Sequence, residues 1–253
     1  MTATTAAYSA SAAAWARGPM RIYGRLAVEL VARSPVTLAS RRVLDLGAGT
    51  GAASHAAAGA HVVAVDRAAG MLQVDRAARP PAAVGDAEAL PFPDRAFDVV
   101  IAAFSLNHLD DPAAGAREAG RVARECVLAS TYAADDDHPV KDAVERALAE
   151  AGWQRPPWYD AAKAAMAAWG SVERSTDVVV AAGLEPVAVE HARVPFPDLT
   201  ARDLVEWRLG MAQTAAFVAA HDQDALADRA LALLPADAGP LVRSVLFIVA
   251  RAR

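Results

Sequence analysis

The fold of this chain is decided by the stretch Val43-Leu44-Asp45-Leu46-Gly47-Ala48-Gly49-Thr50-Gly51. Its first residues form a mostly apolar run typical of a buried strand, and the glycines that follow predict a tight turn. Ala52 to Ala58 can then propagate a helix. Glycines in such a turn let a ligand approach backbone N–H groups, because no Cβ stands in the way.

Two acidic residues follow at the ends of the next two apolar runs. Asp66 ends the run Val62–Val65, and Asp86 closely follows Ala82–Val84. A carboxylate at the end of the second strand can accept hydrogen bonds from ribose hydroxyls. Asp86 can accept from the exocyclic amine of adenine, while the N–H of Ala87 reaches a ring nitrogen. Together these residues predict a cofactor containing a nucleoside, lying across the carboxyl ends of parallel strands.

The glycines alone leave two cofactor classes open. Gly47, Gly49 and Ala52 also fit the G-x-G-x-x-G/A pattern of dinucleotide-binding proteins. Asp45 separates the two classes, because it lies inside the first strand, where a dinucleotide fold usually has an apolar residue. A carboxylate there can hold the turn and face a cationic ligand that bears an amino acid. Asp86 favours the same class.

With these segments the chain resembles the class I S-adenosylmethionine-dependent methyltransferases. The resemblance rests on Val43–Gly51, Val65–Leu72 and Gly85–Val100, and it covers about residues 40–131. It implies an α/β fold with a doubly wound, Rossmann-like, seven-stranded, mostly parallel sheet whose last strand is antiparallel. It also implies S-adenosyl-L-methionine as cofactor. The residues expected to bind it are Asp45, Gly47, Ala48, Gly49, Gly51, Asp66, Arg67, Met71, Gly85, Asp86, Ala87, Phe104 and Ser105.

The composition excludes several classes of protein. A net charge of −5 argues against a nucleic-acid substrate, because proteins that track phosphates usually carry a basic face. Cys126 is the only cysteine, which excludes an intramolecular disulfide and a thiolate metal cluster. No apolar stretch is long enough to span a membrane, and the first residues lack the pattern of a signal peptide. We therefore expect a cytoplasmic enzyme with a small-molecule acceptor, without nucleic acid or membrane partners; a homodimer is compatible with the sequence.

Alternating apolar and helical patterns predict the arrangement of the core. We expect strands near 42–46, 61–66, 82–86, 97–103, 125–131, 186–192 and 244–251, and helices near 52–59, 68–78, 112–123 and 171–182. The cofactor-binding core then comprises 41–132, 171–194 and 239–253. Residues 1–40 predict two helices, broken at Gly18-Pro19. The family resemblance implies that this segment forms a lid over the cofactor.

Two segments, 133–170 and 195–238, lie outside the minimal alternating pattern. Each begins at the carboxyl end of a strand, which is the edge that holds the ligand crevice in a doubly wound sheet. We therefore expect both to form a helical cap over the acceptor site, with one amphipathic helix from Arg202 to Phe217. The aromatic and Met residues of the lid and cap are candidate acceptor contacts, the alternative being simple packing on the core. They are Tyr8, Trp15, Tyr23, Trp153, Trp158, Tyr159, Trp207 and Met211.

His108 is the candidate general base. It follows the fourth strand at the carboxyl edge, and the ordinary pKa of histidine suits proton removal near neutral pH. The alternative is a packed residue that positions the loop. His191, expected to close the sixth strand at the ligand edge, is a weaker second candidate for the acceptor site. Arg208 is expected to face solvent or to stabilise its helix, the alternative being an ion pair with an acidic substrate. Asp135-Asp136-Asp137 predicts a solvated loop, and no metal site is expected.

Several functions fit this pattern. The first is methyl transfer to O, N or C of a small molecule, such as an intermediate of secondary metabolism. The alternative is a related enzyme that keeps the cofactor as a structural element and catalyses a non-methylating reaction such as a cyclisation. A dinucleotide-dependent oxidoreductase is disfavoured by Asp45 and Asp86. A non-catalytic binding module is disfavoured by the intact ligand motifs.

Overall fold

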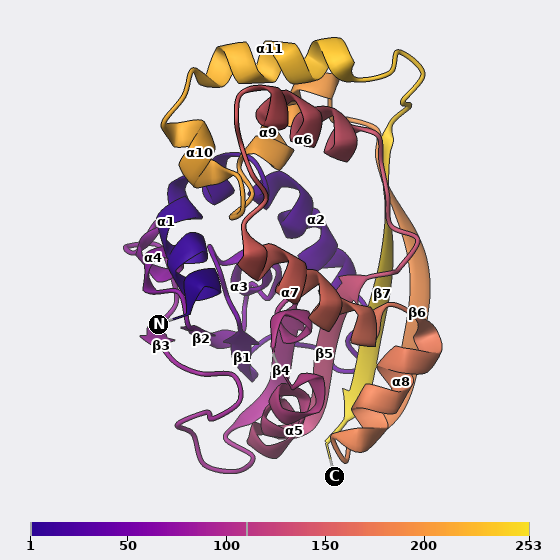
Figure 1. The fold of residues 1–253 in the computed structure, drawn as a ribbon. Coiled ribbons are helices and arrows are strands. Elements are labelled where there is room, and N and C mark those ends of the chain that lie inside the picture. Colours follow the sequence, from indigo (N-terminus) through magenta and orange to yellow (C-terminus); the bar gives the residue numbers. More distant parts are fainter. Residues whose placement is uncertain (1, 110, 253) are drawn as a thin grey trace.

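The computed structural model, which describes residues 2–109 and 111–252, is built around one seven-stranded sheet (Figure 1). Its strands are β1 (Arg42–Leu46), β2 (His61–Asp66), β3 (Ala82–Val84), β4 (Phe97–Ala103), β5 (Ala123–Tyr132), β6 (Glu185–Phe196) and β7 (Leu241–Arg251). Their order in the sheet is β3-β2-β1-β4-β5-β7-β6. Neighbours from β3 to β5 pair in parallel, and β7 runs antiparallel to both β5 and β6. The predicted fold class is therefore confirmed.

The helices alternate with the strands in the first half of the chain. In the second half they lie in two longer segments, one between β5 and β6 and one between β6 and β7. They are α1 (Ala3–Arg17), α2 (Met20–Val31), α3 (Ala52–Ala56), α4 (Ala69–Gln73), α5 (Pro112–Val122), α6 (Val140–Glu150), α7 (Pro157–Met166), α8 (Val172–Ala181), α9 (Ala201–Leu209), α10 (Ala215–Ala219) and α11 (Gln223–Leu233). Two 3-10 turns, η1 (Leu106–His108) and η2 (Ala167–Trp169), complete them.

The two faces of the sheet bury different helices, because successive strand residues point to opposite sides. Val43 and Val99 belong to a core that also holds buried residues of α2 and α3. Leu44 and Val100, their neighbours along the strands, belong to a second core with α5 and α8. Because helices cover both faces of the sheet, polar ligand groups can reach it only at the ends of the strands, and in such folds they bind at the carboxyl ends.

The helices outside the alternating pattern lie beyond the carboxyl ends of the strands. Figure 1 shows α6, α9, α10 and α11 stacked at the top of the molecule, above α1, α2 and the sheet. β5 ends at Tyr132 and β6 ends at Phe196, and both strands are antiparallel to β7. They therefore end at the same edge, and the segments that follow them start there.

Some predicted elements end elsewhere. α4 stops at Gln73 rather than 78, because Asp75 adopts a left-handed backbone with φ of 48° that a helix cannot continue. The helix predicted from Arg202 to Phe217 is two helices, α9 and α10. α9 ends before Gly210, where a Cβ would lie 2.9 Å from the carbonyl oxygen of Ala14, so the chain turns away against α1.

The start of α5 follows the capping rules. The Asp111 side chain accepts hydrogen bonds from the backbone N–H groups of Ala113 (2.9 Å) and Ala114 (3.1 Å), with Pro112 in the first turn. α5 ends at Val122 and β5 begins at Ala123, so no loop residue separates the helix from the strand. Within the described residues, no helix is both long and apolar enough to cross a bilayer.

Candidate functional site

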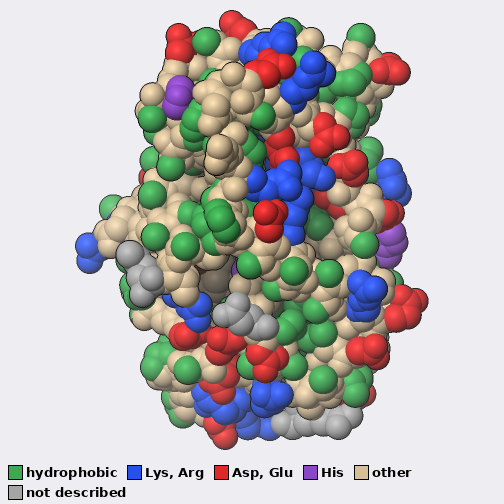
Figure 2. Space-filling model, in the orientation of Figure 1, with side chains coloured by type: hydrophobic (Ala, Val, Ile, Leu, Met, Phe, Trp, Pro, Cys, Tyr) green, Lys and Arg blue, Asp and Glu red, His purple; other side chains and the backbone are tan. Residues whose placement is uncertain are grey.

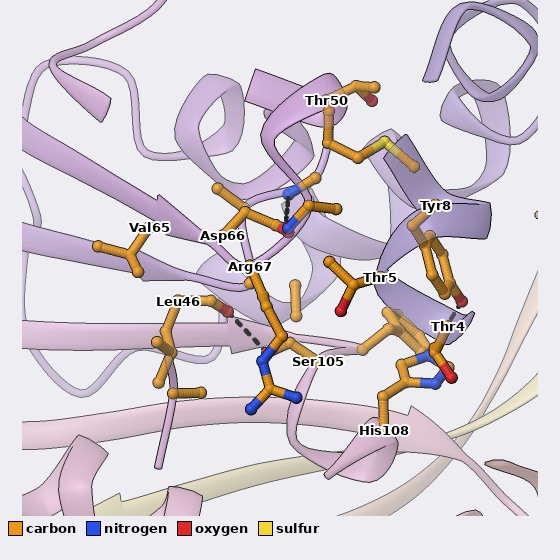
Figure 3. Close-up of a pocket in the computed structure, with 18 of the residues that line it drawn as sticks. Thr4, Thr5, Tyr8, Leu46, Thr50, Val65, Asp66, Arg67, Ser105 and His108 are labelled. Atoms are coloured by element: carbon orange, nitrogen blue, oxygen red, sulfur yellow. Dashed lines mark hydrogen bonds between the residues drawn. The ribbon is translucent and has the colours of Figure 1, made fainter. Parts of the chain in front are cut away.

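A cavity of about 240 Å³ lies at the carboxyl ends of β1, β2 and β4, under α1 (Figure 3). Figure 2 shows a hollow in the molecular surface beside α1. The cavity is bounded by the glycine turn, by the ends of the strands, by η1 and by α1. Its lining residues are Thr2, Thr4, Thr5, Tyr8, Trp15, Tyr23, Leu46, Gly47, Ala48, Gly49, Thr50, Ala52, Val65, Asp66, Arg67, Ala68, Met71, Gly85, Ala87, Ala103, Phe104, Ser105, His108 and Leu109.

The glycine turn leaves the space that a ligand would need. Gly47 and Gly49 have φ angles of 72° and 51°, which favour glycine. A Cβ on Gly47 would lie 2.2 Å from the Cβ of Ser105, whereas a Cβ on Gly49 would meet nothing within 4 Å. Gly47 therefore permits close packing of the turn on the segment after β4. Gly49 keeps the cavity side of the turn open.

Asp66 joins the turn to the cavity. Its carboxylate accepts hydrogen bonds from the N–H of Gly49 and from the N–H of Ala68, both at 2.7 Å. Burial raises the pKa of this carboxyl, while the two N–H donors and Arg79 oppose the shift. A carboxylate so fixed still has free lone pairs toward the cavity, as an acceptor for hydroxyl groups needs.

Asp45 does not line the cavity, contrary to the prediction that it faces the ligand. It is buried, and its Oδ2 accepts hydrogen bonds from the N–H of Ser54 (2.8 Å) and from the Ser54 hydroxyl (2.5 Å). Burial raises its pKa to about 6. Of its two predicted roles, Asp45 thus fills one: it holds the turn against α3. Its carboxylate contacts Ser54 of α3 instead of a cationic ligand.

Asp86 also lies outside the lining. Its Oδ2 accepts a hydrogen bond from Arg67 Nη2 at 2.6 Å, and its pKa is lowered by the N–H of Glu88 and by Arg67 despite some desolvation. Gly51, the third residue outside the lining, is the N-cap of α3. The other ten residues predicted to bind the cofactor all line the cavity: Gly47, Ala48, Gly49, Asp66, Arg67, Met71, Gly85, Ala87, Phe104 and Ser105.

Aromatic side chains form the wall opposite the glycine turn. Tyr8 and Trp15 from α1 and Tyr23 from α2 all line the cavity, as predicted for the lid. The ring centroids of Trp15 and Tyr23 are 5.0 Å apart, and those of Tyr23 and Phe104 are 5.2 Å apart. Phe104 has a φ of 54°, a strained backbone that persists only when the surroundings impose it, as at functional sites.

His108 lies in this wall beside Tyr8. In Figure 3 the Tyr8 hydroxyl points toward the His108 ring, and its oxygen is 3.4 Å from Nε2. Burial lowers the pKa of His108 to about 4 and raises the pKa of Tyr8 well above its usual range. Both side chains are therefore neutral at neutral pH, so His108 can accept a proton and Tyr8 retains its own.

The candidate acceptor residues of the second half of the chain lie outside the cavity lining. Trp207 and Met211 are buried in the core formed with α2. Trp153 Nε1 donates to the carbonyl oxygen of Gln213 at 3.3 Å, and Trp158 packs on Tyr159 with ring centroids 5.9 Å apart. Large apolar side chains of these types serve both core packing and ligand contact, so residue type alone could not separate the two roles.

Arg208, His191 and the acidic loop 135–137 all lie outside the cavity lining and have partners within the protein. Arg208 is buried beside Glu145, 3.6 Å away, and does not face solvent as expected. His191 does not close β6, which continues to Phe196, and its Nε2 lies 2.6 Å from the Ser244 hydroxyl. The acidic loop is only partly solvated, because Asp136 is buried against Arg243. Among the residues that the structure describes, no group of three potential ligands could hold a metal ion.

Sequence reasoning missed two sets of residues. Thr2, Thr4 and Thr5 line the cavity from the start of α1, where no motif marks them. Tyr132 and Arg243 pack behind the aromatic wall, with the Arg243 guanidinium 4.0 Å from the centroid of the Tyr132 ring. Their relationship could not be read from the chain, because it depends on the pairing of β5 with β7.

Comparison with known proteins agrees with this geometry. Residues 44–129 match the family described as methyltransferase domain. The demethylmenaquinone methyltransferase of Renibacterium salmoninarum is 41% identical over 111 residues, which cover 42% of this chain and 45% of that protein. The match thus spans less than half the length of this relative.

Solved structures share the fold at low sequence identity. The cyclase SpnF has a TM-score of 0.56 and 20% identity, with coverage of 90% of this chain and 80% of SpnF. Phosphoethanolamine N-methyltransferase 2 of Haemonchus contortus, in complex with S-adenosyl-L-methionine, has a TM-score of 0.55 and 20% identity, with coverage of 90% and 52%. At this identity the similarity concerns the fold alone.

Proposed function

We propose that this chain, a member of the class I methyltransferase family through its residues 44–129, transfers a methyl group from S-adenosyl-L-methionine to a small-molecule acceptor. The observation that carries the proposal is the single cavity in which the glycine turn, the Asp66 carboxylate and His108 meet. Three features that lie far apart in the chain thereby face one ligand-sized space.

The residues of the cavity fit this cofactor. The open side of Gly49 gives room for the amino-acid portion next to backbone N–H groups, and Asp66 would accept from the ribose hydroxyls. Gly85 and Ala87 would flank the adenine, with the Arg67–Asp86 ion pair at that end. When bound, the cofactor supplies a methyl group already activated by a positively charged sulfur.

The protein then has to align the acceptor and exclude water. Helix α1, together with α2, would act as the lid. The segments 133–170 and 195–238 contribute no residue to the cavity lining, and they would back this lid through the contacts of α7 and α10 with α1. Gly70 supports docking of the lid, since a Cβ there would lie 2.2 Å from the carbonyl oxygen of Ser9 in α1. Such close contact places Tyr8 and Trp15 in the cavity wall.

His108 would take the proton from a hydroxyl acceptor. It is neutral at neutral pH, and Tyr8 lies within 3.4 Å of its Nε2, so the hydroxyl of Tyr8 can orient or relay that proton. A base with a low pKa is sufficient. As the acceptor oxygen bonds to the methyl group it gains positive charge, and its O–H proton becomes strongly acidic.

The proposal is tested by incubating the protein with methyl-labelled S-adenosyl-L-methionine and a panel of phenols, enols and amines. Transfer of label to any acceptor supports it. Conversion of an acceptor without uptake of label would instead support the non-methylating alternative. A thermal shift with NAD and none with S-adenosylhomocysteine would contradict both, since only a ligand that binds the folded form stabilises it.

A further inference from the structure

A buried cation lies directly behind the aromatic wall of the cavity. The guanidinium of Arg243, on β7, is 4.0 Å from the centroid of the Tyr132 ring and 4.7 Å from that of Trp207. Tyr132 in turn packs on two residues of the cavity wall, with ring centroids 4.6 Å from Phe104 and 6.2 Å from Tyr23. The cavity wall and the cation therefore form one packed stack.

The charge of Arg243 is compensated inside the protein. Its Nη2 lies 2.7 Å from Asp136 Oδ2, and each side chain is only 8% exposed. A buried pair of this kind offers no net positive charge to attract an anion, although its field still acts at short range. Because the pair is neutral overall and lies behind the wall, it gives the cavity no net positive charge that would attract a carboxylate or phosphate.

The hydrogen-bonding capacity of this stack is not used up within the protein. The Tyr132 hydroxyl, Arg243 Nε and Trp207 Nε1 are buried without a hydrogen-bond partner in normal geometry among the described residues. An unsatisfied buried polar group costs about 1–3 kcal/mol, so such atoms usually mark a place for water or a ligand. Of the two stack members that line the cavity, Tyr23 and Phe104, only Tyr23 carries a polar group.

The Tyr23 hydroxyl stays protonated beside Tyr132. Burial and its contact with Tyr132 raise the pKa of Tyr23 well above its usual range, and Arg243 opposes that shift. The hydroxyl keeps its proton at neutral pH and can donate it in a hydrogen bond. The rest of the wall, made of Trp15, Phe104 and Tyr8, presents ring faces and edges that suit a flat ligand.

We propose that the acceptor is a flat, uncharged ring compound with a carbonyl oxygen, and that the Tyr23 hydroxyl donates a hydrogen bond to that oxygen. Tyr132 and Arg243 act through Tyr23 as positioning residues: they fix the ring of Tyr23 and the direction of its hydroxyl. This inference rests on the proposed function and narrows its substrate class.

The experiment compares two fluorescent probes of similar size on the full chain saturated with S-adenosylhomocysteine. 7-Hydroxycoumarin carries a ring carbonyl, and 2-naphthol has a similar flat shape without one. We expect 7-hydroxycoumarin to bind about fivefold to tenfold more tightly, as one added hydrogen bond predicts. Tyr23→Phe should abolish this preference, and Tyr132→Phe should reduce it at least twofold.

The controls separate the roles of the residues. Tyr8→Phe removes a hydroxyl from the same wall and should keep the preference for 7-hydroxycoumarin. Binding of S-adenosylhomocysteine, measured separately for each variant, reports folding and the cofactor site. Equal binding of both probes to the wild type, or no binding of either, would overturn the inference, as would a preference that survives Tyr23→Phe. If the wild type does not bind S-adenosylhomocysteine, the result would instead count against the proposed function.

Discussion

The hydroxyl oxygen of Tyr8 lies 3.4 Å from Nε2 of His108, although 100 positions separate the two residues. Tyr8 comes from α1 and His108 from η1, at the carboxyl edge of the sheet. The contact exists only while α1 covers the cavity, so docking of α1 and assembly of the candidate base are the same event.

Removing His108 should separate binding from chemistry. For His108→Ala we expect unchanged affinity for S-adenosylhomocysteine and a rate of methyl transfer to hydroxyl acceptors lower by about 10²- to 10⁴-fold, the usual contribution of a general base. The measurement is label transfer at saturating cofactor. His191→Ala is the control, because His191 is bonded to Ser244 outside the cavity. Equal losses in both variants would argue against a specific role for His108.

Removing the Asp66 carboxylate should abolish cofactor binding. Asp66→Ala deletes the acceptor that faces the cavity and also the hydrogen bonds that fix the N–H groups of Gly49 and Ala68. We expect the thermal shift caused by S-adenosylhomocysteine to disappear. Asp66→Asn, which keeps one acceptor oxygen, should retain part of the shift. Tight binding by Asp66→Ala would contradict the position of the site.

The glycines of the turn should differ in what they tolerate. Gly47→Ala combines a φ of 72° with a clash against Ser105, so we expect a loss of more than about 2 kcal/mol of stability. Gly49→Ala has space for its methyl group and should lose only about 1 kcal/mol, but it should weaken cofactor binding. Gly24→Ala, in the middle of α2 with nothing within 4 Å, should gain up to about 1 kcal/mol. Urea unfolding measures all three.

Stability in acid should depend on two buried groups with opposite signs. The pKa of His108 is lowered to about 4, so the unfolded chain binds more protons and His108 removes stability as the pH falls below its unfolded pKa of 6.5. The pKa of Asp45 is raised to about 6, so the folded chain binds more protons and Asp45 adds stability as the pH falls below 6.

The corresponding variants should reveal these contributions between pH 7 and pH 5. His108→Gln should lose about 2 kcal/mol less stability than the wild type over this interval, and Asp45→Asn should lose about 1 kcal/mol more. The free energy of unfolding in urea at both pH values provides the comparison. Parallel pH curves for the wild type and either variant would show that the group titrates alike in both states.

Docking of α1 should be sensitive to Gly70. A Cβ there would meet the backbone of Ser9, so Gly70→Ala should displace α1, weaken S-adenosylhomocysteine binding about tenfold and change the fluorescence of Trp15. Ser9→Ala removes only the 3.3 Å hydrogen bond from the Gly70 N–H and should have little effect. If Gly70→Ala binds as tightly as the wild type, closure by α1 does not contribute to affinity.

The strand-turn-helix pattern predicted most of the residues that line the proposed cofactor site. Residues Gly47, Gly49, Asp66 and Ala87 were predicted and line one cavity, because each lies within a few residues of a strand's carboxyl end. Asp45 and Asp86 show the limit of that reasoning. Asp45 lies in β1 and Asp86 follows β3, as predicted. The partners of their carboxylates, Ser54 and Arg67, depend instead on side-chain packing.

The sequence by itself determined the sheet, its order of elements and the edge at which ligands would meet, because apolar periodicity and glycine turns are local properties of the chain. Only the tertiary structure decided which side chains face the cavity. It joined Tyr8 to His108 and buried Arg243 against Asp136 and Tyr132. Such contacts form between segments far apart in the chain, and their energy depends on burial and orientation, which no short stretch of sequence specifies.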